Sequence, residues 1–122
     1  MGDSLLDLTD KLWSGDLSVR GIHTVTSTRD LEEVAPGIAF VPAFGNVSAF
    51  ATDGALVLVD TGNQRRANRN FAQVRGWSKL PLDTAVYTHG HIDHVFGLGP
   101  FETEAERDGR PGPRVVSHEA VP

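Results

Sequence analysis

The sequence has no cysteine among its 122 residues. Disulfide bonds and thiolate metal sites are therefore excluded. The lack of cysteine fits a reducing compartment. The sequence also lacks a signal peptide and any apolar run long enough to span a membrane. We therefore expect a cytoplasmic protein with no membrane partner.

Charge of one sign is not concentrated anywhere in the chain. The 11 basic and 16 acidic residues give a net charge of −5, which argues against nucleic acid as a partner. Two common enzyme signatures are missing as well. No G-x-S-x-G motif supports a serine hydrolase. The G-L-G at residues 97–99 lacks the third glycine and the preceding strand of a dinucleotide site.

The length allows one domain, and the 39% of hydrophobic residues allow a core. Leu5, Leu8 and Leu12 recur at helical spacing and predict a short amphipathic helix over residues 4–13, with Ser4 or Asp3 at its start and Gly15 at its end. We interpret this helix as a packing element, and a partner-binding arm is the alternative. Residues 1–35 are thus expected to form a helix and an extended lead-in, and residues 36–122 the main domain.

Turn residues divide the main domain into strands and one helix. Three strands joined by tight turns are predicted over residues 38–41, 47–50 and 55–59, and the last is apolar throughout, as in a strand buried on both faces. A helix follows, with Phe71, Val74 and Trp77 on one side. The arginines on its other side, which either form a solvated face or meet an anionic ligand, are Arg65, Arg66 and Arg69. Two more strands are predicted at residues 84–87 and 114–117, and a polar loop with a helical turn at its start over residues 102–113.

This order predicts an α/β layered domain, in which sites collect at the carboxyl ends of strands. H-G-H-I-D-H at residues 89–94 follows such a strand, and Asp60 ends another. His89 and His91 share a face in extended backbone, while Asp93 and His94 lie in the next turn. Imidazole and carboxylate are zinc ligands, and two pairs can hold one or two ions. The alternative is a polar loop in which three histidines meet by chance.

The H-x-H-x-D-H order resembles the signature of the metallo-β-lactamase superfamily. The likeness extends to V-D-T-G at residues 59–62 and covers roughly residues 36–118. Y-T-H-G-H-I-D-H-V-F-G at residues 87–97, followed by V-V-S-H-E at residues 115–119, looks most like the alkylsulfatase branch. The resemblance implies the N-terminal half of an αββα sandwich, truncated in this chain.

By this likeness His89 and His91 bind a first zinc ion, and Asp93 and His94 bind a second. Asp60 is a buried group that orients the motif loop. The implied activity is metal-dependent hydrolysis of a small-molecule substrate, such as an alkyl sulfate ester, in which Asp93 is the catalytic residue that orients or deprotonates the attacking water.

The family's remaining ligands normally come from a second half. After His94 the chain offers only His118, Glu119 and the acids of residues 102–108, and residues 118–122 do not form an H-E-x-x-H motif. We interpret His118 as structural. Two hypotheses stay open: a zinc hydrolase that is incomplete as this chain, or a non-catalytic truncated homologue or fragment. Self-association or a complementing chain is the partner that either hypothesis implies.

Overall fold

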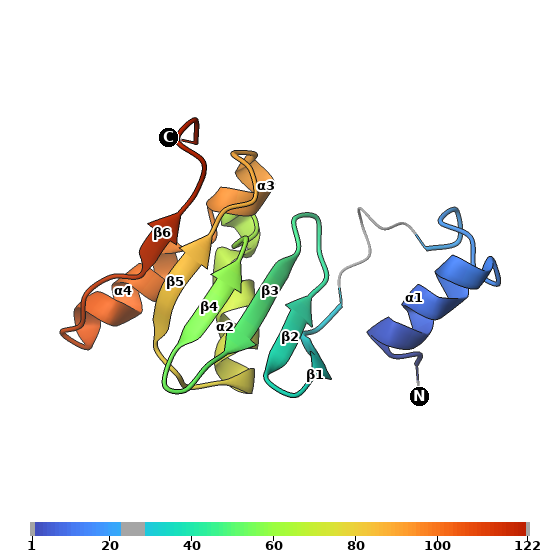
Figure 1. Ribbon diagram of the computed structural model, residues 1–122, viewed down its shortest axis with the longest axis horizontal. Helices are drawn as coiled ribbons and strands as arrows, with labels where there is room; N and C mark the ends of the chain where they lie inside the picture. Colours follow the sequence, from blue (N-terminus) through green and yellow to red (C-terminus); the bar gives the residue numbers. More distant parts are fainter. Residues whose placement is uncertain (1, 23–28, 122) are drawn as a thin grey trace.

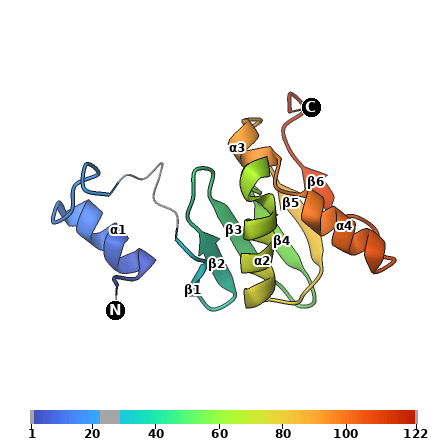
Figure 2. The ribbon, with the colours of Figure 1, turned by 180° about the vertical axis from the view of Figure 1, so that it is seen from behind.

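A six-stranded sheet with helices on one face forms the body of the protein (Figures 1 and 2). The structure is a computed structural model that describes residues 2–22 and 29–121. The strands follow one another across the sheet in chain order. Their bounds are β1 (Glu32–Ala35), β2 (Ile38–Val41), β3 (Val47–Ala51), β4 (Leu56–Val59), β5 (Leu82–Val86) and β6 (Arg114–Val116). The predicted α/β class and the five predicted strands are confirmed.

The sheet changes from antiparallel to parallel at β4. The first four strands form an antiparallel meander, whereas β5 pairs with β4, and β6 with β5, in parallel. A parallel neighbour needs a crossover connection, and helices supply both. The first consists of the 3₁₀ helix η1 (Gln64–Arg66) and α2 (Ala67–Trp77), and the second of α3 (Ile92–Val95) and α4 (Gly99–Arg107). The carboxyl ends of β4 and β5 therefore lie side by side at one edge of the sheet.

The core lies between the sheet and the helices α2 and α4. The row of paired residues Ala39, Ala49, Leu58 and Ala85 is buried on this side. Val74 of α2 and Phe101 of α4 belong to the same cluster. Burial of these apolar side chains is the main stabilising contribution to the fold.

The opposite face of the sheet carries apolar side chains that are only half-buried. They alternate along the strands with the core residues and are Ile38, Phe40, Phe50, Val57, Val59 and Val86. Figures 1 and 2 show both long crossover helices on the other side. The prediction that the strand over residues 55–59 is buried on both faces is therefore wrong, because Val57 and Val59 are only half-buried and no helix among the described residues lies on their side of the sheet.

The predicted N-terminal helix is confirmed as α1 (Leu5–Ser14). Ser4 and Asp7 form a reciprocal capping box, and Gly15 ends the helix in the left-handed conformation with φ 85°. No residue of α1 is buried. Its link to the sheet is the Glu32 carboxylate, which accepts hydrogen bonds from the Leu5 N–H at 2.9 and 3.0 Å.

Two elements differ from the sequence predictions. Residues 102–107, predicted as a helical turn at the start of a polar loop, belong to the longer helix α4, because Phe101 and Ala105 are buried four residues apart and Pro100 occupies the first turn. Strand β1 was not predicted. It is held by backbone pairing with β2, and its alternate residues Glu33 and Ala35 are exposed.

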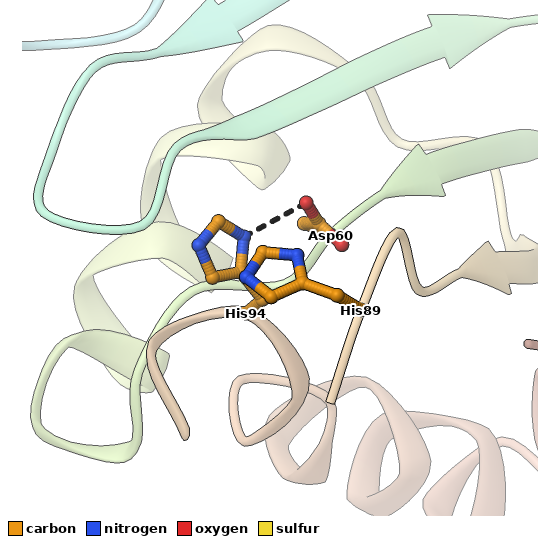
Figure 3. Close-up of side chains that lie close together, drawn as sticks. All are labelled: Asp60, His89 and His94. Atoms are coloured by element: carbon orange, nitrogen blue, oxygen red, sulfur yellow. Dashed lines mark hydrogen bonds and ion pairs between the residues drawn. The ribbon is translucent and has the colours of Figure 1, made fainter. Parts of the chain in front are cut away.

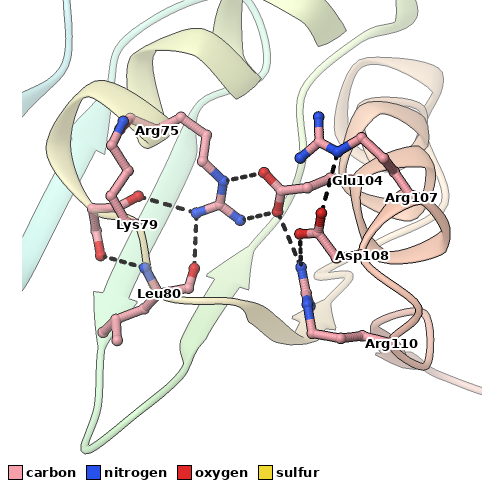
Figure 4. A network of polar contacts seen from close by, with 8 residues as sticks. Arg75, Lys79, Leu80, Glu104, Arg107, Asp108 and Arg110 are labelled. Carbon is pink, nitrogen blue, oxygen red and sulfur yellow. Dashed lines mark hydrogen bonds and ion pairs between the residues drawn. The ribbon is translucent and has the colours of Figure 1, made fainter.

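An ion pair joins α2 to α4 (Figure 4). The Arg75 guanidinium donates to both oxygens of the Glu104 carboxylate at 2.7 and 2.6 Å, and each side chain is 11% exposed. The same guanidinium donates to the carbonyls of Ser78 and Leu80. It also lies near two aromatic rings, 5.6 Å from the centroid of Phe71 and 5.4 Å from that of Phe101.

Candidate metal centre

The polar cluster lies where β4 and β5 end side by side. Asp60 directly follows β4, His89 follows β5, and His91 precedes α3, which holds Asp93 and His94. One ligand atom from each of Asp60, His89 and His94 lies within 4.8 Å of the others (Figure 3). The motif is therefore a spatial cluster as well as a run in sequence.

Asp60 holds this cluster together. The residue is 7% exposed, and its carboxylate accepts hydrogen bonds from the Thr88 N–H at 2.8 Å, the Thr88 hydroxyl at 2.7 Å and His94 Nδ1 at 2.8 Å. Burial alone raises the pKa of a carboxyl group, but these hydrogen bonds outweigh it and the pKa of Asp60 lies below its usual value. Both oxygens are thus occupied by donors within the protein.

The hydrogen bonds also decide which nitrogen of each histidine is free. An ionised carboxylate only accepts, so His94 Nδ1 donates to it, and Nε2 is the nitrogen of His94 that this bond leaves for a metal. The Thr88 hydroxyl gives its one proton to Asp60, so it accepts from His89 Nδ1 at 2.9 Å. In His89, too, Nε2 is therefore the nitrogen left for a metal. Metal-binding histidines are commonly oriented by such a bond at the other nitrogen.

His91 and Asp93 lie beside these two rings. The His89 ring centroid is 4.6 Å from that of His91 and 4.1 Å from that of His94. Asp93 Oδ2 is 3.2 Å from His94 Nε2, the nitrogen that faces away from Asp60. The structure thus places His91 and Asp93 each next to one of the two other predicted ligands. The mutually close trio contains Asp60 in place of His91 and Asp93, but a metal at Asp60 would have to displace Thr88 or His94.

The atoms in this cluster that could bind a metal are imidazole nitrogens and carboxylate oxygens. This set fits zinc and neighbouring transition metals. Sequence reasoning missed Thr88. Its position next to the first histidine was visible, but its bond to Asp60 depends on the pairing of β4 with β5.

Close backbone contacts fix the motif loop against the sheet. The Thr61 N–H and hydroxyl both donate to the His94 carbonyl, at 2.7 and 3.0 Å. A Cβ on Gly97 would overlap the Thr61 carbonyl, and a Cβ on Gly45, which has φ 78°, would overlap the Asp93 carbonyl. Only glycine permits such approaches. The ligand-bearing turn is therefore held from two sides.

A protein-family model matches the part of the chain that carries this cluster. The family model described as Metallo-beta-lactamase superfamily matches residues 41–105, more than half of the chain. The chain belongs to the metallo-beta-lactamase superfamily. A search of curated proteins found no match.

Solved metallo-beta-lactamases share the fold at low sequence identity. A Cronobacter sakazakii enzyme with a HARLDQ motif is 15% identical with TM-score 0.64, and the match covers 85% of this chain and 38% of that one. The subclass B3 enzyme BJP-1 of Bradyrhizobium japonicum is 18% identical with TM-score 0.64, covering 83% and 37%. A B3 enzyme with an active-site glutamic acid is 22% identical with TM-score 0.62, covering 86% and 38%. The chain therefore spans under two fifths of the length of these structures.

A groove of ≈ 790 Å³ adjoins the metallo-beta-lactamase motif. Its lining residues are Phe44, Asn63, Gln64, Arg65, Arg66, Arg69, Ile92, Asp93 and Phe96. The three arginines predicted to share one side of this helical region therefore line a groove that Asp93, a predicted metal ligand, also lines. His118, in contrast, lies in a turn after β6 where its Nδ1 accepts from the Ala120 N–H.

Within the described residues, no helix has the length and apolar character to cross a membrane.

Proposed function

We propose that this chain is the metal-binding part of a metallo-β-lactamase-type hydrolase that acts on a small molecule. The observation that carries the proposal is the bonding of Asp60 and Thr88, which holds the Nδ1 atoms of His89 and His94 and leaves Nε2 of each ring pointing away from these bonds, with Asp93 Oδ2 3.2 Å from His94 Nε2. Metal-binding histidines are commonly oriented by such a hydrogen bond at the nitrogen that does not hold the metal.

In this proposal His89 and His91 hold one zinc ion and Asp93 and His94 hold another. Zinc, when bound, supplies Lewis acidity and lowers the pKa of water. Asp93 faces both the histidine cluster and the groove, so it is placed to orient the attacking water and to take its proton. Asp60 and Thr88 keep the two histidine rings in the required tautomer.

The finer parts of the proposal rest on the sequence resemblance. The residues of the motif, which resemble the alkylsulfatase branch, suggest an alkyl sulfate ester as substrate. The lack of cysteine suggests a cytoplasmic location. Catalysis also needs walls that fix the substrate. Since the chain spans under two fifths of the neighbouring structures, those walls would come from a complementing segment or chain.

A non-catalytic homologue is the second candidate. The observation in its favour is the half-buried apolar face of the sheet, which in a complete family fold packs against a second sheet. Such a chain would keep the motif without the remaining ligands and would bind zinc weakly or not at all.

Zinc titration separates the proposal from an inert loop. Purified protein, titrated against a chromophoric chelator, should bind zinc more weakly than complete family members, because the ligands that the second half of the family fold supplies are absent. His94→Ala should abolish the binding, while His118→Ala, in the turn after β6, should not change it. If wild type and His94→Ala bind zinc equally, the proposed site is wrong.

A further inference from the structure

The groove beside the motif has a charge opposite to that of the whole chain. The net charge of the chain is −5. The groove, however, is lined by Arg65, Arg66 and Arg69 against the single carboxylate of Asp93. Its volume of ≈ 790 Å³ lies in the range of small-molecule sites, roughly 300–1,000 Å³.

Two of the three arginines are available to a ligand. Arg69 is engaged with Asp30 at 2.9 Å and with the Arg29 carbonyl at 3.1 Å. Among residues 2–22 and 29–121, no carboxylate lies within 4.0 Å of the guanidinium nitrogens of Arg65 or Arg66. The segment 23–28 contains no acidic residue. A guanidinium presents a planar fork of donors that matches an oxyanion.

The rest of the groove has an apolar rim. Phe44 is 51% exposed, Ile92 72% and Phe96 54%. They come from the β2–β3 loop, from α3 and from the turn after α3, and yet all three line the same groove. Exposed large hydrophobic side chains that gather around a groove indicate a binding site, whereas scattered ones do not.

We infer that this groove binds an amphipathic organic anion. Its oxyanion group contacts Arg65 and Arg66, and its apolar body contacts Phe44, Ile92 and Phe96. Because Asp93 lines the groove and lies 3.2 Å from His94 Nε2, the bound molecule lies next to the candidate metal centre, and in that respect the inference rests on the proposed function. Arg65 and Arg66 are then specificity-determining residues for an anionic substrate.

The test uses hexanesulfonate, which cannot be hydrolysed, with the full chain in EDTA. Ligand-observed NMR at low protein concentration gives Kd for hexanesulfonate, for 1-hexanol and for inorganic sulfate. Hexanesulfonate should bind most tightly. Arg65→Gln and Arg66→Gln should each raise its Kd by about threefold to tenfold, the range for partly exposed charged contacts. Arg20→Gln removes the same charge outside the groove and should leave Kd unchanged.

Other results overturn the inference. Equal binding of 1-hexanol and hexanesulfonate, or wild-type Kd in both arginine variants, excludes a role for the guanidinium groups. Equal binding of inorganic sulfate excludes the apolar contacts. Zinc titration keeps the two proposals apart. If the arginine variants lose hexanesulfonate while His94→Ala retains it and wild type binds no zinc, only the metal proposal fails.

Discussion

Thr88 is the residue on which the tautomers of the candidate centre depend. It links the Asp60 carboxylate to His89 Nδ1 through one hydroxyl, and its N–H bonds the same carboxylate. Thr88→Val removes the hydroxyl while keeping the shape of the side chain. We expect zinc affinity to fall roughly 10- to 100-fold, the usual cost of removing a group that orients a ligand.

Thr88→Ser is the matched control, because it keeps the hydroxyl and should bind zinc within a few-fold of wild type. Chelator competition measures both variants. Equal affinity of the valine and wild-type proteins would show that the His89 ring needs no partner at Nδ1.

Gly97 tests the contact that docks the motif loop. A Cβ there would overlap the Thr61 carbonyl, although the φ of Gly97 lies outside the left-handed region. Gly97→Ala should therefore destabilise the fold by about 1–3 kcal/mol, the range for overpacking, and should weaken zinc binding. Urea unfolding at one fixed protein concentration measures the change. Gly112→Ala, where a Cβ meets no atom within 4 Å, should be neutral, and equal effects of the two changes would contradict the argument.

At the scale of elements, the sequence predicted those strands and helices that are marked by apolar runs between turns or by helix-capping residues. Strands β2, β3 and β4 were predicted from apolar runs between turns, and α1 from Ser4, its leucines and Gly15. Helix α4 was predicted only as a helical turn, because only Phe101 and Ala105 of its side chains are buried, too few for a visible period. In the same way, the four ligand types were readable from the motif, whereas the bonds of Asp60 and the approach of Gly45 exist only after β4, β5 and the β2–β3 loop have packed.

The Arg75–Glu104 pair should be the main polar contact between α2 and α4. Removing one partner of a buried pair leaves the other charge unsatisfied, at a cost of about 3–5 kcal/mol. Arg75→Met should approach that loss, moderated by Arg110, which lies 3.4 Å from the same carboxylate. The double variant with Glu104→Leu should regain part of it. Urea unfolding midpoints of the single and the double variant measure both stabilities. A double variant less stable than Arg75→Met alone would mean that the packing of the Glu104 side chain, and not its charge, dominates here.

At the scale of the molecule, the isolated chain should be a very poor hydrolase. The groove is open to solvent, and the candidate metal ligands come only from the end of β4 and from the short motif loop after β5. Rate enhancement requires a substrate held in a fixed position, and this chain covers under two fifths of the neighbouring enzymes. Assays with alkyl sulfates, lactams and thioesters in excess zinc should give turnover near background. Robust turnover that disappears in His91→Ala would refute this expectation.

The open sheet face gives the most direct test of how the chain exists in solution. Its side chains Ile38, Phe50, Val57, Thr84 and Arg114 form one paired row, and Phe40, Ser48, Val59, Val86 and Val116 form the next. The part of these rows on β2, β3 and β4 is apolar except for Ser48, whereas Thr84 and Arg114 are polar, and no helix of the described chain covers the face (Figures 1 and 2). An apolar face of this extent favours association, since covering it removes apolar surface from water.

The purified chain should therefore self-associate. Sedimentation at several protein concentrations should show a mass that rises with concentration. Phe40→Ser and Phe50→Ser together should shift the distribution toward monomer, because both side chains lie on the open face and neither belongs to the core cluster. Trp13→Ser is the control, since Trp13 is 93% exposed on α1, away from the sheet. A wild-type monomer at all concentrations, with a sharp cooperative melt, would mean that the half-buried face is stable in water without a second layer.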